Sequence, residues 1–274
     1  MRLSIVIVTY NSRLDVTKCL DSVHSYPPPM PHEVVVVDNA SPDGTAAALR
    51  STRSDVRVID AGGNLGFAHA NNLGIQQTTG DLILLLNPDT TVTAGALGRL
   101  VAALEAAPDA AVAGPRLVDP SGRPELSFGS MVSPFTELRQ KILMRGNARG
   151  RGLVAARVRA LTLRPHDVDW VSGACLLVRR SDAQAVGLLD ERYFMYLEDV
   201  DFCAAVRRRG RRVMFVPGAE VVHHRGQSRA TATAATNAAY RRSHIAFYEK
   251  HHRLCAPLLR LYLKMRGELP DSPI

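Results

Sequence analysis

Three short runs in the first hundred residues are apolar at nearly every position, and they constrain the fold more than any other feature of the chain. They read LSIVIVTY (3–10), EVVVVDNA (33–40) and DLILLLN (81–87). A strand that is apolar throughout has both faces buried, which is typical of a parallel sheet covered by helices on both sides. Segments with helical spacing separate the runs, so the sequence predicts an α/β fold with a doubly wound, mostly parallel sheet.

Polar clusters follow the predicted strands at their carboxyl ends, which is where doubly wound sheets bind ligands. They are Thr9-Tyr10-Asn11, Asp38-Asn39, Gly62-Gly63-Asn64 and Asn87-Pro88-Asp89. Polar residues are common in loops, so any single cluster needs no special explanation. The occurrence of polar clusters at four strand ends predicts a binding site at this edge of the sheet.

Asp89 is the clearest candidate for a metal ligand. Pro88 fixes its own φ and restricts Asn87, so the carboxylate stands on a stiff tripeptide. A carboxylate at the mouth of a parallel sheet suits a hard divalent cation that is shared with substrate phosphates. The alternative is that Asp89 caps the helix predicted to follow.

Asp38 ends a run of four valines, where an acid can accept a hydrogen bond from a ribose hydroxyl or a base N–H. The alternative is a local turn within DNASPDG, which Asp and Asn favour. The glycine-rich segment 62–66 could bring backbone N–H groups close to phosphate. It is not G-x-G-x-x-G, so a dinucleotide site of the Rossmann type is disfavoured.

Three acids, Glu198, Asp199 and Asp201, lie within four residues before an amphipathic segment. Acids at a helix start suit the helix dipole and need no function. Clustered carboxylates also repel one another, which raises at least one pKa and creates a usable general base. The preceding aromatic segment, 193–197, would shield such a base from water.

His223 and His224 follow the apolar run EVV. Neutral imidazole is a good metal ligand, and one of the two could complete a site begun by Asp89. Adjacent residues of a strand point to opposite faces, so we expect at most one of them to bind metal. The alternative is a surface pair without function.

The charge is uneven along the chain. Residues 1–110 carry 7 Lys and Arg against 11 Asp and Glu, whereas residues 111–274 carry 27 against 15. Residues 138–166 hold 8 basic residues and no acid, which predicts a mobile basic loop or a pair of exposed helices. A basic half implies an anionic partner. Nucleic acid is disfavoured because a recognition motif and interleaved aromatic residues are missing.

The remaining composition is that of an ordinary globular protein. No apolar run approaches the roughly 20 residues of a membrane-spanning helix. The four cysteines are scattered without a C-x-x-C pair, so we expect a reducing cytoplasm and neither zinc nor disulfides.

Taken together, these segments resemble family 2 glycosyltransferases with the GT-A fold, especially their rhamnosyltransferase-like branch, which builds bacterial surface polysaccharides. The resemblance runs to about residue 250. It rests on VIVTYN (6–11), VVVDNASPDGT (35–45), NLGFAHANNLGI (64–75), LLLNPDTTV (84–92), WVSGACLLVRR (170–180), DERYFMYLEDVDFCAAVRRRG (190–210) and VVHHRGQS (221–228).

The resemblance implies a role for each matching position. The nucleotide sugar would be held by Thr9, Tyr10, Asn11, Asp38, Asn64, Gly66, Asn71, Asn87 and Asp89. Asp89 and His223 would bind Mg²⁺ or Mn²⁺, and Asp199 would be the general base that deprotonates the acceptor. The sugar and acceptor pocket would be shaped by Trp170, Gly173 and Glu198. Asn87 replaces the first acid of the family's Asp-x-Asp, which removes one anionic ligand from the metal.

The implied enzyme moves a sugar, with rhamnose as the first expectation, from a dTDP- or UDP-sugar to a glycan or lipid-linked acceptor, with inversion. The alternative is a binding protein that holds a nucleotide sugar or glycan precursor without catalysis. We expect a glycosyltransferase domain over 1–228, with a nucleotide-sugar half (1–110) and an acceptor half (111–228). A helical extension (229–274) and the basic segment would provide peripheral contact with the inner face of the cell membrane.

Overall fold

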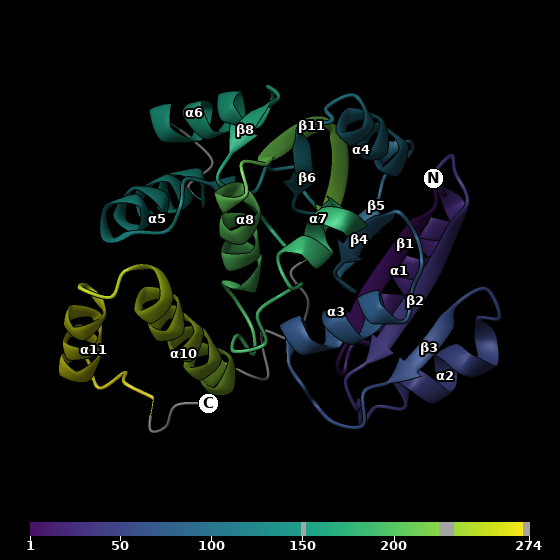
Figure 1. Ribbon diagram of the computed structural model, residues 1–274, viewed down its shortest axis with the longest axis horizontal. Helices are drawn as coiled ribbons and strands as arrows, with labels where there is room; N and C mark the ends of the chain where they lie inside the picture. Colours follow the sequence, from purple (N-terminus) through teal and green to yellow (C-terminus); the bar gives the residue numbers. More distant parts are fainter. Residues whose placement is uncertain (149–151, 225–232, 271–274) are drawn as a thin grey trace.

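The computed structural model describes residues 1–148, 152–224 and 233–270. One large sheet carries helices on both faces, and a helical C-terminal region lies beside it (Figure 1). The strands are β1 (Leu3–Thr9), β2 (His32–Asp38), β3 (Arg57–Asp60), β4 (Leu82–Leu86), β5 (Thr90–Val92), β6 (Ala110–Val118), β7 (Phe128–Gly129), β8 (His166–Val168), β9 (Trp170–Val171), β10 (Cys175–Arg179) and β11 (Arg212–His223). The helices are α1 (Arg13–Ser25), α2 (Thr45–Thr52), α3 (Phe67–Gln76), α4 (Ala96–Glu105), α5 (Pro134–Ala148), α6 (Leu153–Leu161), α7 (Arg180–Ala185), α8 (Glu198–Arg208), α10 (Thr233–His251) and α11 (Ala256–Met265).

The main sheet has the strand order β3-β2-β1-β4-β10-β6-β11-β5, and β8 pairs with β11. Strands β1, β2, β3 and β4 run in parallel. Because β10 is antiparallel to both β4 and β6, strand β6 and its parallel neighbour β11 also point the same way. The mostly parallel α/β sheet is therefore confirmed, and six carboxyl strand ends meet at one edge.

The apolar runs are explained by burial on both faces of the sheet. In β1, Ile5 and Ile7 belong to one core with residues of α1 and α4, whereas Val6 and Val8 belong to a second core with residues of α3 and α8. Each face of the strand thus packs against helices, as the predicted doubly wound arrangement requires.

The second half departs from the predicted elements in two places and agrees with them in a third. The apolar run WVSGACLLVRR (170–180) predicts one strand, but the segment is two strands, because Ser172-Gly173-Ala174 turns the chain between β9 and β10. The run that begins at Arg211 predicts a strand, a turn around Pro217-Gly218 and a second strand, but Arg212–His223 form one strand, β11, with a shift of register between Val216 and Glu220. The basic segment 138–166 contains helices α5 and α6, which is the second of the two predicted forms.

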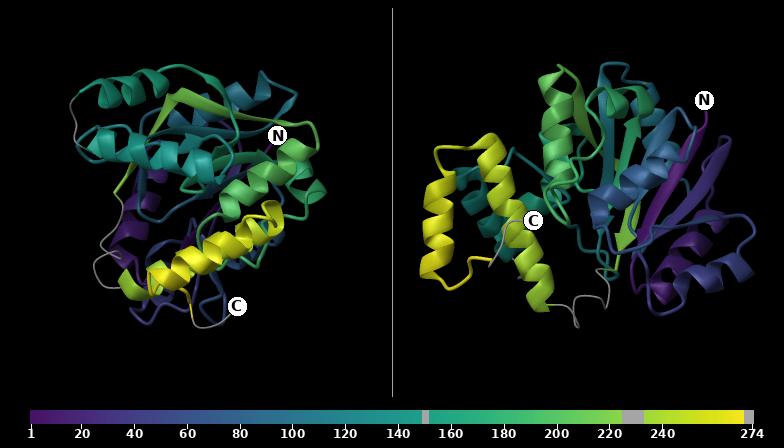
Figure 2. Two further views of the ribbon diagram at one scale, coloured as in Figure 1. Left: turned by 90° about the vertical axis from the view of Figure 1, so that its left-hand side faces the viewer. Right: turned by 60° about the horizontal axis from the view of Figure 1, so that its bottom comes forward.

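Helix α10 packs against the region where α8 begins (Figure 2). A third core joins Tyr193 and Val200 to Phe247, Tyr248 and Ala256 of the C-terminal region. No helix among the described residues is both long and apolar enough to cross a membrane. The domain boundaries expected from the sequence remain predictions.

Candidate active site

The edge formed by the carboxyl ends of β1, β2 and β3 carries a row of polar residues. Thr9 is in register with Asp38, and Asp38 is in register with Asp60. Beside this row lies an open cavity of about 430 Å³, lined by residues that include Asp38, Ser41, Arg50, Asp60 and Gly62. Its size and position suit the nucleoside part of a ligand bound at a strand edge.

Asp38 makes the local turn that the sequence offered as an alternative. Its Oδ2 accepts a hydrogen bond of 3.0 Å from the amide of Ser41. Its buried Oδ1 has no hydrogen-bond partner among the described residues. The turn therefore fixes the carboxylate and leaves one oxygen available to a ligand.

Several other buried polar atoms at this edge lack a hydrogen-bond partner within the described part of the chain. They include Thr9 Oγ1 at the end of β1, Asn87 Oδ1 after β4 and Glu198 Oε2 at the start of α8. Burying a polar atom without a partner costs free energy, so native proteins keep such atoms rare. Their concentration along one sheet edge indicates a site that a polar ligand completes.

The glycine-rich loop is held by a residue to which the sequence assigned no role. The side-chain N–H₂ of Asn39 donates to Asn64 Oδ1 at 3.1 Å and to the carbonyl of Gly66 at 3.2 Å. Gly66 has φ +83°, and a Cβ there would lie 2.4 Å from the carbonyl oxygen of Phe194. Glycine at this position therefore permits close approach of segment 193–197.

The other predicted nucleotide-sugar residues lie on or near this edge. Tyr10 and Asn11 follow β1 and are exposed, and the amide of Asn11 donates to Ser41 Oγ at 3.0 Å. Asn71 is buried in α3, where its Nδ2 donates to the carbonyl of Phe67 at 2.9 Å. Their contacts with a nucleotide remain predictions.

Asp89 and His223 are brought together by strand pairing. His223, the last residue of β11, is in register with Thr90, which follows Asp89 directly. His223 Nε2 lies 3.4 Å from Asp89 Oδ1. The alternative, in which Asp89 caps the following helix, is wrong, because that helix, α4, begins only at Ala96.

A third residue, Glu125, contacts the same imidazole. Glu125 Oε2 lies 3.1 Å from His223 Nδ1, so the ring is held between two carboxylates. Burial lowers the pKa of His223, but hydrogen bonds and charge attraction from Asp89 and Glu125 outweigh it and raise the pKa to about 9. Glu125 therefore orients the ring and leaves Nε2 directed at Asp89.

The pair Asp89 and His223 fits a shared cation. Two ligand atoms bound side by side at about 2.1 Å from one ion lie about 3 Å apart, close to the separation of Asp89 Oδ1 and His223 Nε2. Among the described residues there is no group of three or more His, Cys, Asp or Glu arranged around one point. Two protein ligands would leave further positions on such a cation for other oxygen ligands.

The neighbouring His224 has another role. Its amide donates to the carbonyl of Asp89 at 2.8 Å, and its Nε2 lies 2.8 Å from Thr91 Oγ1. Only one of the two histidines therefore faces the Asp89 carboxylate, as strand alternation predicted.

Asp199 is held at the start of α8 by two backbone amides. Oδ2 accepts a hydrogen bond of 2.8 Å from the amide of Gly173, and Oδ1 accepts one of 2.8 Å from the amide of Val200. The next carbonyl along the turn, that of Ala174, accepts from the amide of Asn87 at 2.9 Å. The turn between β9 and β10 thus connects Asp199 to the end of β4.

The two neighbouring acids Glu198 and Asp199 differ in their ionisation. Burial raises the pKa of Glu198 well above its ordinary value, and the charge on Asp199 raises it further. Burial also raises the pKa of Asp199, although the amides of Gly173 and Val200 oppose this effect. Glu198 is therefore the more easily protonated member of the pair, and Asp199, whose carboxylate two amides stabilise, is the better candidate for a proton acceptor.

Gly173 lies beside this carboxylate, and Trp170 lies three residues before Gly173, in β9. A Cβ at Gly173 would lie 3.4 Å from the Cβ of Asp199, so the glycine lets the turn approach α8 closely. The Nε1 of Trp170 donates to the carbonyl of Ser130 at 2.9 Å. Contact of either residue with sugar or acceptor remains a prediction.

Sequence reasoning placed Asn39 in a strand-end cluster without assigning it a contact, and it missed Arg50, Asp60 and Glu125 as residues of this site. Asp60 ends the short run VRVID, so the strand-end pattern that singled out Asp38 applied to it as well. Glu125 lies in a loop, 98 residues from His223, and only the folded chain brings the two together.

Comparison with known proteins agrees with this geometry. The family model for glycosyl transferase family 2 matches residues 4–153. The chain is 34% identical to the N-acetylglucosaminyl-diphospho-decaprenol L-rhamnosyltransferase of Mycobacterium tuberculosis, with 98% of this chain and 95% of that protein covered. It is 29% identical to the low-salt glycan biosynthesis hexosyltransferase Agl10 of Haloferax volcanii, over 75% of this chain and 62% of that protein.

Among solved structures, the fold is similar to that of a mannosyltransferase from Pyrobaculum calidifontis in complex with GDP-Man and Mn²⁺. The TM-score is 0.62 at 19% identity, with 94% of this chain and 67% of that one covered. GalNAc-T7 with UDP, GalNAc and Mn²⁺ gives a TM-score of 0.62 at 17% identity, over 82% of this chain and 44% of that one. These likenesses show the GT-A fold. The sequence matches show more, and the chain belongs to glycosyl transferase family 2.

Proposed function

We propose that the protein transfers a sugar, with rhamnose as the first candidate, from a dTDP- or UDP-sugar to a hydroxyl of a lipid-linked glycan precursor, with inversion at the anomeric carbon. The observation that carries the proposal is the carboxylate of Asp199, held by the amide of Gly173 beside the end of β4. The similarity to a rhamnosyltransferase along almost the whole chain supports the choice of sugar and acceptor class.

The donor would lie along the sheet edge. Its nucleoside would occupy the cavity beside Asp38 and Asp60, where carboxylate oxygens can accept hydrogen bonds from ribose or base. Its diphosphate would then reach Asp89 and His223. A divalent cation held by this pair would supply positive charge that stabilises the departing diphosphate.

The transfer itself would be one displacement. Asp199 removes the proton from the acceptor hydroxyl while its oxygen forms a bond to the anomeric carbon. The bond from that carbon to the diphosphate breaks, and the diphosphate leaves with the electron pair. Attack opposite the leaving group inverts the configuration. The raised pKa of Asp199 makes it a stronger base than an ordinary aspartate.

We further propose that the protein meets its acceptor at the inner surface of the cell membrane. Helix α11 carries an exposed apolar stripe at the spacing of one helix face, formed by Leu258, Leu261 and Met265 and continued by Leu254 before it. Exposed basic residues, Arg260 and Lys264, lie along one side of it. An apolar stripe with basic residues is typical of a helix that lies in the interface of an anionic bilayer.

Helix α5 repeats this pattern on the same side of the molecule. Phe135, Leu138 and Ile142 are exposed at helical spacing, with Arg139 and Lys141 between them. Figure 2 shows α5, α6 and α11 together on the side turned to the viewer in its left panel. The nucleotide edge at β3 lies on the opposite side in Figure 1.

The catalytic proposal is tested by incubating the purified protein with a panel of nucleotide sugars, Mn²⁺ and a polyprenyl-diphosphate-linked acceptor. We expect release of nucleoside diphosphate and an acceptor that gains the mass of one sugar, with the anomeric configuration inverted by NMR. Binding of a donor without turnover on any acceptor of this class would favour the non-catalytic binding protein instead.

The membrane proposal is tested by co-sedimentation with vesicles that contain phosphatidylglycerol. The double variant Leu258→Glu and Leu261→Glu should bind these vesicles at least tenfold more weakly than the parent. The matched control is Leu14→Glu on α1, where the side chain is 74% exposed but lies outside the stripe. Binding that is equal on neutral and anionic vesicles, or unchanged in the double variant, would contradict the proposal.

A further inference from the structure

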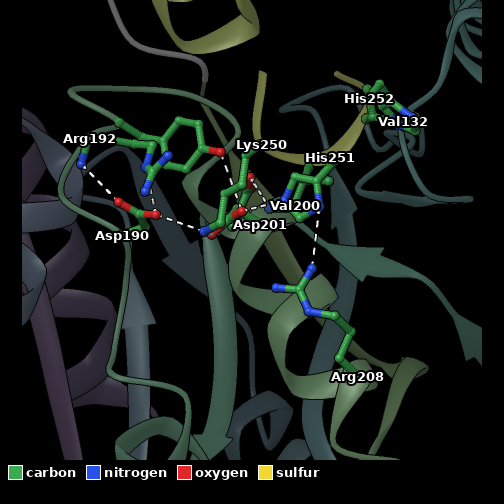
Figure 3. Close-up of polar contacts among 11 residues, drawn as sticks. Val132, Asp190, Arg192, Val200, Asp201, Arg208, Lys250, His251 and His252 are labelled. Atoms are coloured by element: carbon green, nitrogen blue, oxygen red, sulfur yellow. Dashed lines mark hydrogen bonds and ion pairs between the residues drawn. The ribbon is translucent and has the colours of Figure 1, made fainter. Parts of the chain in front are cut away.

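Asp201 lies two residues after Asp199 in the first turn of α8, and its carboxylate is almost completely buried. Residues of the C-terminal helix α10 surround it (Figure 3). Lys250 Nζ lies 2.7 Å from Asp201 Oδ2 and also 2.7 Å from Asp190 Oδ2. His251 Nε2 lies 2.5 Å from Asp201 Oδ1.

The contacts of His251 define where its proton lies. Arg208 NH1 lies 3.3 Å from His251 Nδ1. A guanidinium can only donate, so Nδ1 accepts and the ring proton lies on Nε2, facing Asp201. Burial raises the pKa of Asp201, but its hydrogen bonds from His251 and Lys250 outweigh this and hold the pKa below its ordinary value. Asp201 is thus a fully paired carboxylate, unlike Glu198 and Asp199 beside it.

Helix α10 also holds the chain on the other side of the acidic pair. Ser243 Oγ donates to the carbonyl of Met195 at 2.7 Å. The rings of Tyr240 and Tyr196 meet edge to face with centroids 5.8 Å apart. Contacts from α10 therefore lie both before and after Glu198 and Asp199.

The backbone between these contacts is strained. Tyr196 and Leu197, the two residues before α8, have φ of +71° and +67°. Residues other than glycine rarely adopt this conformation, which costs free energy and persists only where the surroundings enforce it. Three residues of α10 are placed to enforce this conformation. Ser243 holds the chain before the two strained residues, and Lys250 and His251 hold it after them.

We propose that α10 positions the general base: Ser243, Lys250 and His251 fix segment 195–201 so that Asp199 meets the amide of Gly173 and faces the acceptor. This inference rests on the proposed role of Asp199. The three residues act through Met195 and Asp201 and are positioning residues. The C-terminal region, which lies beyond the matched residues 4–153, is accordingly part of the catalytic apparatus.

The test compares Lys250→Met with Lys18→Gln, which removes an exposed lysine from α1. Displacing a catalytic group by about 1 Å lowers the rate on the order of 10²-fold. We expect Lys250→Met to lower kcat about 10- to 100-fold with the KM for the donor within twofold of the parent. Lys250→Arg should restore most of the kcat, and Lys18→Gln should match the parent.

Loss of Lys250 also leaves buried carboxylates uncompensated, which lowers stability by itself. The double variant with Lys250→Met and Asp201→Asn separates the two effects. The Tm should recover in the double variant while kcat stays low, because the tie between α10 and α8 is still missing. Recovery of kcat together with Tm would overturn the inference, as would a single variant with kcat within twofold of the parent.

A readout that needs no turnover keeps this inference distinct from the proposed function. In hydrogen–deuterium exchange of the full chain, amides of segment 195–201 should exchange at least tenfold faster in Lys250→Met than in Lys18→Gln. If the parent shows no sugar transfer, the proposed function fails, and this exchange measurement still decides the inference. Equal exchange in the two variants would overturn it.

Discussion

The amide of Gly173 donates a hydrogen bond of 2.8 Å to Oδ2 of Asp199, across 26 positions of the chain. The bond joins the turn between β9 and β10 to the first turn of α8. Because the carbonyl of Ala174 in the same turn accepts from the amide of Asn87, Asp199 and the end of β4 share one rigid connection. The proposed base and the proposed diphosphate site are thereby held in fixed relation, as the proposed single displacement requires.

Gly66→Ala should disturb the donor side of the site. Alanine at this position would have to keep φ +83°, and its methyl group would lie 2.4 Å from the carbonyl oxygen of Phe194. The backbone strain alone costs about 1–3 kcal/mol of stability, and the clash adds to it. Gly187→Ala is the matched control, because Gly187 has φ +84° with open space around it. Thermal unfolding should show a larger loss of Tm for Gly66→Ala, and equal losses would contradict the packing role.

Asp89→Ala should abolish the metal dependence of nucleotide binding. Calorimetric titration of the parent with UDP or dTDP should show at least tenfold tighter binding when Mn²⁺ is present, because the diphosphate and Asp89 share the cation. The variant should bind equally with and without Mn²⁺. Asp21→Ala, on the exposed surface of α1, serves as the control. A variant that keeps the Mn²⁺ effect would remove Asp89 from the metal site.

The stability of the metal-free protein should depend on pH through His223. Its pKa rises from 6.5 in the unfolded chain to about 9 in the fold. The protonated ring therefore contributes stability that is fully present below pH 6.5 and is lost as the pH rises towards 9. The Tm difference between the parent and His223→Gln should be larger at pH 6 than at pH 9.5. A difference that is constant with pH would contradict the raised pKa.

Asp60→Ala should weaken donor binding without slowing the chemical step. Asp60 lines the cavity at the strand edge, in register with Asp38 and away from Asp199. A residue that binds ground state and transition state equally affects KM and leaves kcat unchanged. We expect the donor KM to rise about tenfold in steady-state kinetics. A fall in kcat at unchanged KM would place Asp60 elsewhere in the mechanism.

The sheet and much of its ligand edge could be predicted from sequence because their signals are local. Continuous apolar runs mark strands buried on both faces, and the residues that follow them, such as Thr9, Asp38 and Asn87, lie at the edge by connectivity alone. The segment 170–180 misled this reasoning, since its apolar residues on both sides of Gly173 look like one strand.

Contacts between distant segments could not be predicted in this way. Glu125 faces His223 across 98 positions and Lys250 faces Asp201 across 49, and neither Glu125 nor Lys250 differs in local sequence from an ordinary surface residue. The cluster at 198–201 predicted a raised pKa, but the division of roles among its members depends on burial and on α10. Asp201 is paired, whereas Glu198 has a buried oxygen without a hydrogen-bond partner among the described residues.

The most direct test of the account is the rate of sugar transfer by Asp199→Asn. Asparagine has nearly the volume of aspartate, and its amide oxygen can still accept the hydrogen bond from the amide of Gly173. It cannot take up the proton of the attacking hydroxyl group. General-base catalysis contributes about 10²- to 10⁴-fold, so kcat should fall by that factor while the Kd for the nucleotide sugar stays within twofold of the parent. Transfer within a few fold of the parental rate would contradict the assignment of Asp199 as the base.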